Sequence, residues 1–164
     1  MTTAEVLKKE FDLISKELTE KYDQLGMRAS GRWEREKEVK IKESGTRLVG
    51  TIWGASYTGA LEFGRGPTKG KGGSGKTLRD AIYQWIIDKR ITSEIPIRSL
   101  AFLIARKIHK VGWKRERYGG VELISSVITT ERIDQIIQKV GTIYVDVIVR
   151  GLVKELENFA KEAA

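Results

Sequence analysis

Apolar residues recur every three or four positions in four stretches of the chain, and this spacing places them on one face of a helix. Thr2 or Thr3 is expected to cap the first helix, and Gly26 to end it. Thr77, with Asp80 three positions on, has the capping-box pattern of the second. The stretches cover residues 3–25, about 77–89, about 96–111 and roughly 131–161.

Between the first two helical stretches the period changes to two, which is typical of β-strands. Residues 35–43 read REKEVKIKE and residues 46–53 read TRLVGTIW, with Ser44-Gly45 suited to a tight turn between them. In the second strand Val49 and Trp53 point away from Leu48 and Ile52. Both faces are therefore partly apolar, which predicts a strand covered on two sides, by the chain's own helices and by another copy of the protein.

The last helical stretch also contains a strand-like pattern. Four β-branched residues alternate over residues 142–150, namely Ile143, Val145, Val147 and Val149. The longer helical spacing favours a helix, bent at Gly141 or Gly151, but the strand remains an alternative. The elements together predict an α+β fold: an N-terminal helix, an antiparallel β-hairpin or small sheet, then several helices. We expect one domain, residues 1–164, in which residues 121–164 form a helical C-terminal extension.

Composition narrows the chemistry. The chain has no cysteine and a single histidine, His109, which excludes disulfides and thiolate metal sites and leaves little nucleophile–histidine chemistry. We expect no cofactor and no enzymatic activity. No run of 18 apolar residues occurs, so no membrane span is predicted, and the N-terminus lacks the apolar block of a signal peptide. A net charge of +8 favours contact with polyanions.

A glycine-rich loop, residues 64–76, carries the most conspicuous motif. Residues 70–77 read GKGGSGKT and match the phosphate-loop pattern. A working phosphate loop springs from a buried apolar strand of a parallel sheet and is accompanied by a metal-binding aspartate on a second strand. Residues 63–69 (FGRGPTK) cannot form such a strand, and Asp146 falls inside an expected helix. A nucleotide hydrolase is therefore only a remote alternative. Few apolar residues occur in the loop, so it should be mobile unless a partner orders it.

Other motifs are similar to those of a known family. A first helix is followed by GMRASG at residues 26–31, a hairpin, Tyr57, and LEFGRGP at residues 61–67. A WIIDK segment at residues 85–89 and SLAFLIARKI at residues 99–108, closed by Gly112, come next. This order resembles the minor tail or tail-completion proteins of tailed bacteriophages, over about residues 5–115. The resemblance implies an α+β fold, no catalytic residues, assembly into a homo-oligomeric ring, and a place in the virion neck or tail beside portal, connector or tail proteins. Assembly would take place in the host cytoplasm.

The tyrosine–LEFG element supplies candidate interface residues. In this element three apolar residues surround the carboxylate of Glu62. Within the chain, this carboxylate would accept hydrogen bonds from nearby N–H groups or pair with an arginine. The alternative is that it pairs with a neighbouring subunit across a ring interface. Together with Trp53 at the end of the second strand, the candidates are Trp53, Tyr57, Leu61, Glu62 and Phe63.

The basic residues of the glycine-rich loop are candidates for weak, sequence-independent contact with DNA in the neck channel. They are Arg65, Lys69, Lys71 and Lys76. The alternative function is a basic nucleic-acid-binding module, suggested by the net charge and by the basic and aromatic residues at 113–118 (WKRERY).

Overall fold

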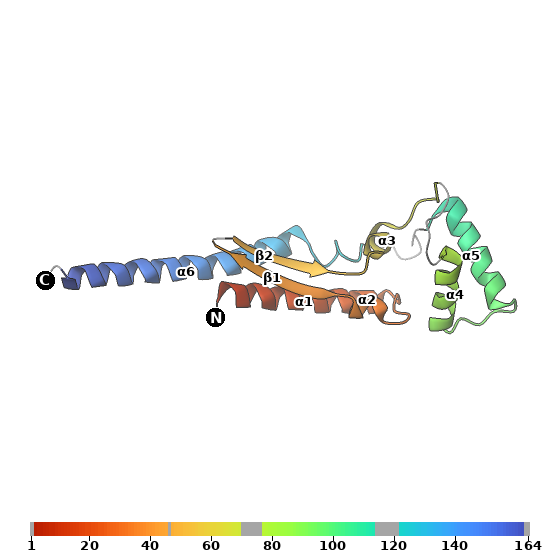
Figure 1. The fold of residues 1–164 in the computed structure, drawn as a ribbon, viewed down its shortest axis with the longest axis horizontal. Coiled ribbons are helices and arrows are strands. Elements are labelled where there is room, and N and C mark those ends of the chain that lie inside the picture. The colour runs from red at the N-terminus through yellow and green to blue at the C-terminus, as the bar shows by residue number, and fades with distance from the viewer. Residues whose placement is uncertain (1, 46, 70–76, 114–121, 163–164) are drawn as a thin grey trace. The chain divides into compact units, whose positions relative to one another are not determined.

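The structure is a computed structural model that describes residues 2–45, 47–69, 77–113 and 122–162 (Figure 1). It confirms the predicted α+β class, with an N-terminal helix, a two-stranded antiparallel hairpin and several further helices. In chain order the elements are α1 (Thr3–Gln24), α2 (Arg32–Arg35), β1 (Glu38–Ser44), β2 (Arg47–Trp53), α3 (Thr58–Phe63), α4 (Leu78–Asp88), α5 (Ile97–Val111) and α6 (Thr130–Glu162).

The chain forms two compact units, and both are discontinuous in sequence. The hairpin unit comprises Met1–Glu17, Glu38–Trp53 and Val127–Ala164, and the helical unit comprises Leu18–Lys37 and Gly54–Ser126. The chain therefore passes between the units four times, and α1 contributes residues to both. No single position in the sequence separates them, which explains why no boundary is visible in the composition.

In the hairpin unit, α1 lies along one face of the two strands (Figure 1). The register pairs Val39 with Ile52 and Ile41 with Gly50, so these side chains share a face. A Cβ built on Gly50 would lie 2.5 Å from the ring of Phe11, which shows how closely that ring approaches the strand. A larger residue there would therefore have to displace the phenyl ring of Phe11.

The opposite face of the hairpin carries Val49 and Trp53, and both are exposed. The pairing places them opposite Lys42 and Glu38, respectively, on the neighbouring strand. The chain's own helices therefore cover one face, which holds Leu48, Gly50 and Ile52. Val49 and Trp53 stand on the other face, for which contact with another copy of the protein stays a prediction.

The third part of the hairpin unit is α6, a continuous helix of 33 residues. It includes residues 142–150, so the helical interpretation of the alternating valines is confirmed over the strand. A strand there would need a partner edge for its backbone groups, whereas a helix satisfies them internally. Ile136 is buried near the start of α6, which shows that this half of the helix packs on the unit.

The helical unit is built around α4 and α5, which pack against each other. Thr77 and Asp80 form the predicted capping box at the start of α4, with mutual side-chain-to-backbone hydrogen bonds of 3.2 Å. Ile86 of α4 is fully buried, and so is Ala101 of α5. Small residues on α5 thus allow the two helices to approach closely.

Three segments differ from the predicted elements. In the tyrosine–LEFG element, for which the sequence predicted no helix, Thr58–Phe63 forms the helix α3. The first strand begins at Glu38 rather than at residue 35, because Arg32–Arg35 forms α2. Residues 122–129 form turns, so the helical part of the C-terminal extension begins at Thr130. Leu123 in these turns is fully buried.

Candidate assembly surfaces

The tyrosine–LEFG element has its only charge turned inward. Glu62 is 7% exposed, and its carboxylate accepts hydrogen bonds from the backbone N–H of Ile124 (2.6 Å), the N–H of Ser125 (3.1 Å) and the Ser125 hydroxyl (2.6 Å). Burial acts to raise the pKa of Glu62, but these hydrogen bonds outweigh it and hold the pKa below its ordinary value. Both carboxylate oxygens thus accept hydrogen bonds within the chain, which is the first of the two predicted roles for Glu62.

The other predicted interface residues divide by exposure. Trp53 is 59% exposed and Phe63 83% exposed, and Tyr57 is also exposed. Leu61 is half-buried, on the inward side of α3. Trp53 belongs to the hairpin unit, whereas the three others belong to the helical unit. The structure therefore leaves Tyr57 and Phe63 as the accessible apolar side chains of the element.

The two motifs that carry the family resemblance meet in the helical unit. Arg65 and Trp113 form an isolated antiparallel bridge, with N–H to carbonyl distances of 2.7 and 2.6 Å. The backbone N–H of Thr68 donates to the carbonyl of His109 at 3.1 Å. Residues 65–68 are thereby attached to the C-terminal end of α5. The side chain of His109 contacts the Thr68 hydroxyl at 2.6 Å, which gives this histidine a local structural contact.

Gly112 makes this junction possible. It ends α5 with a φ of 78° and a ψ of −168°, a conformation that residues with a side chain rarely adopt. A Cβ at this position would lie 2.2 Å from the carbonyl oxygen of Arg65. The glycine therefore permits both the backbone turn and the close approach of residues 65–66.

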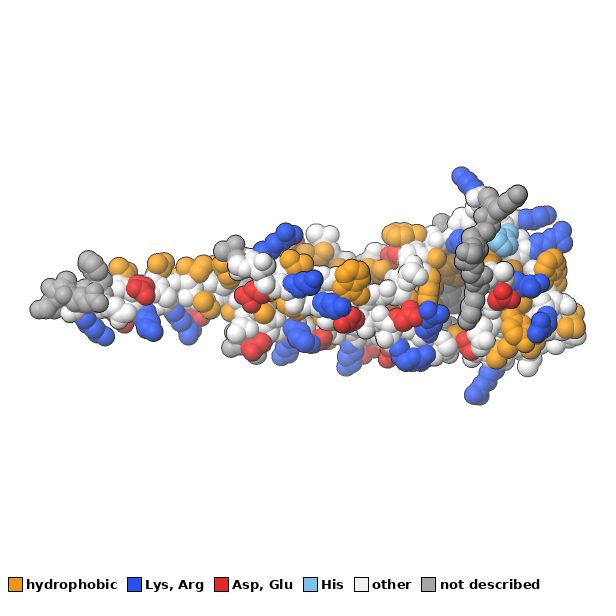
Figure 2. All heavy atoms as spheres, in the orientation of Figure 1, with side chains coloured by type: hydrophobic (Ala, Val, Ile, Leu, Met, Phe, Trp, Pro, Cys, Tyr) orange, Lys and Arg blue, Asp and Glu red, His pale blue; other side chains and the backbone are white. Residues whose placement is uncertain are grey.

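A basic surface surrounds the junction. Helix α5 contains no acidic residue, and its exposed cations are Arg98, Arg106, Lys107 and Lys110. Arg65 and Lys69 of the attached segment are also exposed. Figure 2 shows several basic side chains near the pale blue histidine. Two of the four predicted DNA-contacting residues thus lie beside further cations that the sequence analysis did not single out. Lys71 and Lys76 lie outside the described residues, as do residues 70–76 of the phosphate-loop match and residues 114–118 of the basic-aromatic segment.

The structure gives the phosphate-loop match little support. The element before the loop is the helix α3, and the strands among the described residues form one antiparallel pair. The Thr77 hydroxyl, which would be a magnesium ligand in a phosphate loop, instead donates to the Asp80 carboxylate at 2.6 Å. Over the described parts of the chain, no cluster of three or more His, Cys, Asp or Glu is arranged to hold a metal ion.

A long apolar surface lies on α6, and sequence analysis did not assign it a role. Between Tyr144 and Leu156 the apolar side chains of this helix are exposed, including Leu152 at 60% and Leu156 at 69%. Figure 2 shows hydrophobic side chains along one side of α6 and charged side chains of both signs along the rest. The exposed apolar residues from this part of the helix are Tyr144, Val145, Val147, Ile148, Val149, Leu152, Val153 and Leu156.

A signal for this surface is present in the sequence. Apolar residues at 143–145, 147–149 and 152–153 cover well over half of the circumference of a helix, more than one packing face needs. No helix in the described parts of the chain is long and apolar enough to cross a membrane. The apolar excess on α6 marks a surface that the described residues leave exposed.

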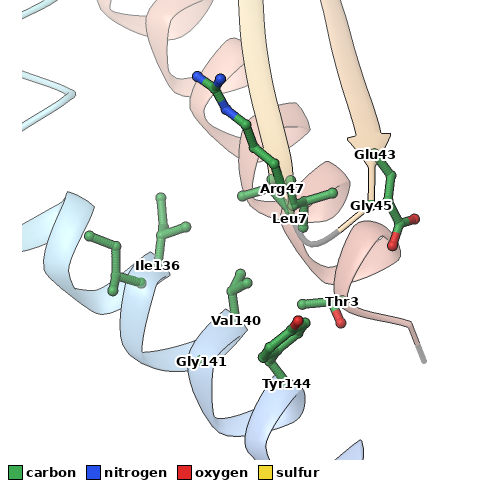
Figure 3. A pocket seen from close by; sticks show the side chains of 11 residues that line it. Thr3, Leu7, Glu43, Gly45, Arg47, Ile136, Val140, Gly141 and Tyr144 are labelled. Atoms are coloured by element: carbon green, nitrogen blue, oxygen red, sulfur yellow. The ribbon is translucent and has the colours of Figure 1, made fainter.

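An open apolar groove adjoins this surface. It has a volume of about 380 Å³ and lies between α1, the turn end of the hairpin and α6 (Figure 3). Ile136, Val140 and Tyr144 of α6 face Leu7 of α1 across it. Glu43 and Arg47 from the two strands stand at its rim.

Comparison of the chain with models of known protein families, with curated proteins and with solved structures gave no significant match. The functional argument therefore depends on the surfaces and on the motifs.

Proposed function

We propose that this chain is a non-enzymatic structural protein that assembles with copies of itself into a ring, as part of the head–tail junction or tail of a tailed bacteriophage. The observation that carries the assembly part is the uncovered apolar surface of α6, with side chains from Tyr144 to Leu156 exposed. A patch of this kind is rarely left in water by a monomeric protein and is typical of an interaction site.

The place in a virion follows from the motif resemblance, and the junction of the two motifs supports it. LEFGRGP at residues 61–67 and the α5 segment are 30 or more positions apart in sequence, yet Arg65 pairs with Trp113 and Thr68 with His109. The pair of motifs thus corresponds to one structural element. Exposed Tyr57 and Phe63 on the same unit provide further apolar contact area for neighbouring proteins.

A second candidate function is nucleic-acid binding, favoured by the basic surface of α5 with Arg65 and Lys69. In a ring through which a genome passes, this surface would make weak contacts with phosphates that do not depend on sequence. Tight binding would oppose passage of the DNA. The basic surface is therefore compatible with the ring and also with a separate binding module.

The test has two parts. Light scattering coupled to size-exclusion chromatography and negative-stain imaging of the purified chain should show a closed oligomer. Purified particles of the phage that encodes it should contain the chain, detected by mass spectrometry. A chain that stays monomeric at high concentration, and that remains in the lysate when particles are purified, would overturn the proposal. A stable monomer that binds DNA would favour the second candidate.

A further inference from the structure

We propose that the groove between α1, the hairpin turn and α6 receives the C-terminal half of α6 from a second copy of the chain. This inference rests on the self-assembly in the proposed function and names the two surfaces that form the contact. The α6 arm is defined here as residues 145–156, and the α6 groove by Leu7, Leu48, Ile136 and Val140 with their rim residues.

The arm needs a partner because the described residues of the chain leave its apolar side chains exposed. Seven of them are exposed over less than four helical turns: Val145, Val147, Ile148, Val149, Leu152, Val153 and Leu156. Their combined apolar area is on the order of the largest patch on a typical monomer, about 300–600 Å². Covering the arm in each of two copies would approach the area of a small specific interface.

The arm cannot fill the groove of its own chain. Ile136, Val140 and Tyr144 form one wall of the groove, and the same uninterrupted helix continues into the arm. A straight helix cannot place residues 148–156 against its own residues 136–144. An apolar helix that enters this groove must therefore come from another molecule, and every copy carries one.

The charges also favour a second copy. The arm and its flanking residue Glu157 carry three acids and two bases, namely Asp146, Glu155 and Glu157 with Arg150 and Lys154. The rim of the groove carries one residue of each sign, Glu43 and Arg47. Because the arm and the rim each carry both signs, charges of an arm can pair with opposite charges at the groove of a second copy. A nucleic acid or an anionic lipid surface would instead favour a polar side rich in Lys and Arg.

The consequence is a heterologous contact, because the arm and the groove are different surfaces. Heterologous contacts close into rings when the rotation between copies allows it, and otherwise give open filaments. This geometry matches the ring of the proposed function. It differs from a two-fold pairing of arms, in which the same residues would meet across an axis.

Cysteine cross-linking tests the contact directly, since the chain contains no cysteine. Two variants are made with different tags, Leu48→Cys in the groove and Leu152→Cys on the arm. After mixing and mild oxidation, we expect a disulfide between the two tags, at least tenfold above the yield when Gln135→Cys replaces the groove variant. Gln135 is exposed on α6 and does not line the groove.

A second variant, Leu152→Asp with Leu156→Asp, should remove the oligomer without unfolding the chain, because both positions are exposed. Circular dichroism and thermal unfolding check the fold. Suppose that the wild type is an oligomer, but the cross-linking mixture yields disulfides only between two copies of the Leu152→Cys variant, or the aspartate variant remains an oligomer. Either result shows that the arm-in-groove contact is wrong, while assembly stands. If the wild type is a monomer, assembly itself fails. A third outcome is that no cross-link forms, the wild type co-sediments with phosphatidylcholine–phosphatidylglycerol vesicles, and the aspartate variant does not. This outcome would assign the arm to a lipid surface instead.

Discussion

Glu62 and Ile124 are joined by a hydrogen bond of 2.6 Å between the carboxylate and the backbone N–H, although 62 positions separate them in the sequence. Together with two bonds from Ser125, it ties α3 to the turns that precede α6. The contact explains why a carboxylate stands among the apolar residues of the LEFG element.

Substitution of Glu62 should therefore reduce stability. Glu62→Ala removes the acceptor of the N–H groups of Ile124 and Ser125, which are half-buried and exposed residues, respectively, and we expect a loss of about 1–3 kcal/mol. Glu62→Gln keeps one acceptor oxygen and should cost less. Urea unfolding of both variants, monitored by tryptophan fluorescence, measures the difference. A loss below about 0.5 kcal/mol for the alanine variant would show that solvent replaces these bonds at no cost.

The same residue predicts a pH dependence. The pKa of Glu62 in the folded chain is below its ordinary value of 4.5, so the unfolded chain binds the proton more readily. The stabilisation is present in full above the ordinary pKa and is lost as the pH falls through the lowered value. Unfolding free energies of the wild type should decrease over that acidic range, and Glu62→Gln should show a smaller decrease. Identical slopes for the two proteins would contradict the assignment.

Gly112→Ala should disrupt the junction of the two motifs. The new methyl group would lie 2.2 Å from the carbonyl oxygen of Arg65, in a backbone conformation that favours glycine. We expect a loss of about 2–4 kcal/mol, from strain and from the broken bridge to Trp113. Gly59→Ala in α3 is the matched control, because a Cβ there meets nothing within 4 Å. It should be neutral or stabilising by up to about 1 kcal/mol.

A set of ion pairs joins α1 to α6 in the hairpin unit. Glu10 is 8% exposed and forms ion pairs with Lys139 at 2.7 Å and with Arg132 at 3.7 Å. Arg132 also pairs with Glu17, at 3.3 Å. Glu10→Ala should cost about 2–4 kcal/mol, because it leaves a half-buried arginine with less compensation. In double-mutant cycles the coupling of Glu10 with Arg132 should exceed that with exposed Lys139, for which about 0.5 kcal/mol is expected. The reverse order would show that the shorter contact dominates.

Binding to double-stranded DNA should be weak and strongly dependent on salt. Non-specific contacts of this kind have dissociation constants of about 10⁻⁴–10⁻⁶ M at physiological salt. Replacing Lys107 and Lys110 of α5 by serine should weaken binding and lower the salt slope by about 1–2. Replacing Lys9 and Lys42 of the hairpin unit removes the same charge and should change the slope less. Equal effects of the two pairs would indicate a general charge effect rather than a surface on α5.

Most of the secondary structure could be predicted because it depends on local periodicity. The stripes of α1, α4 and α5, the alternation in the hairpin and the cap at Thr77 are all visible within windows of a few residues. The short helices α2 and α3 could not be predicted in this way. They have four and six residues, which are too few to show the 3.6-residue spacing of apolar positions. Both are fixed by contacts distant in sequence: Trp33 of α2 stacks on Tyr22 at 4.5 Å and donates to the Thr58 hydroxyl at 3.0 Å.

The candidate surfaces were predicted less completely, for a similar reason. The sequence identifies Glu62 as a charge among apolar residues, but nothing near it indicates that its partners are at residues 124–125. Phe63 could be proposed as exposed only by its place in a motif. The apolar excess on α6 was visible, yet its neighbours could be assigned only once the fold showed which half of the helix packs on α1.

The passage of the chain between its two units has a consequence during synthesis. The first helix and the hairpin leave the ribosome early, but the third part of the hairpin unit begins only at Val127. At about 5–20 residues per second, the interval between residues 53 and 127 is on the order of several seconds. Throughout that time Leu7, Leu48 and Glu10 lack the covering that α6 later provides. The nascent chain is therefore expected to depend on holding chaperones, and truncations that remove Ile136 should aggregate more than truncations that remove only residues 145–164.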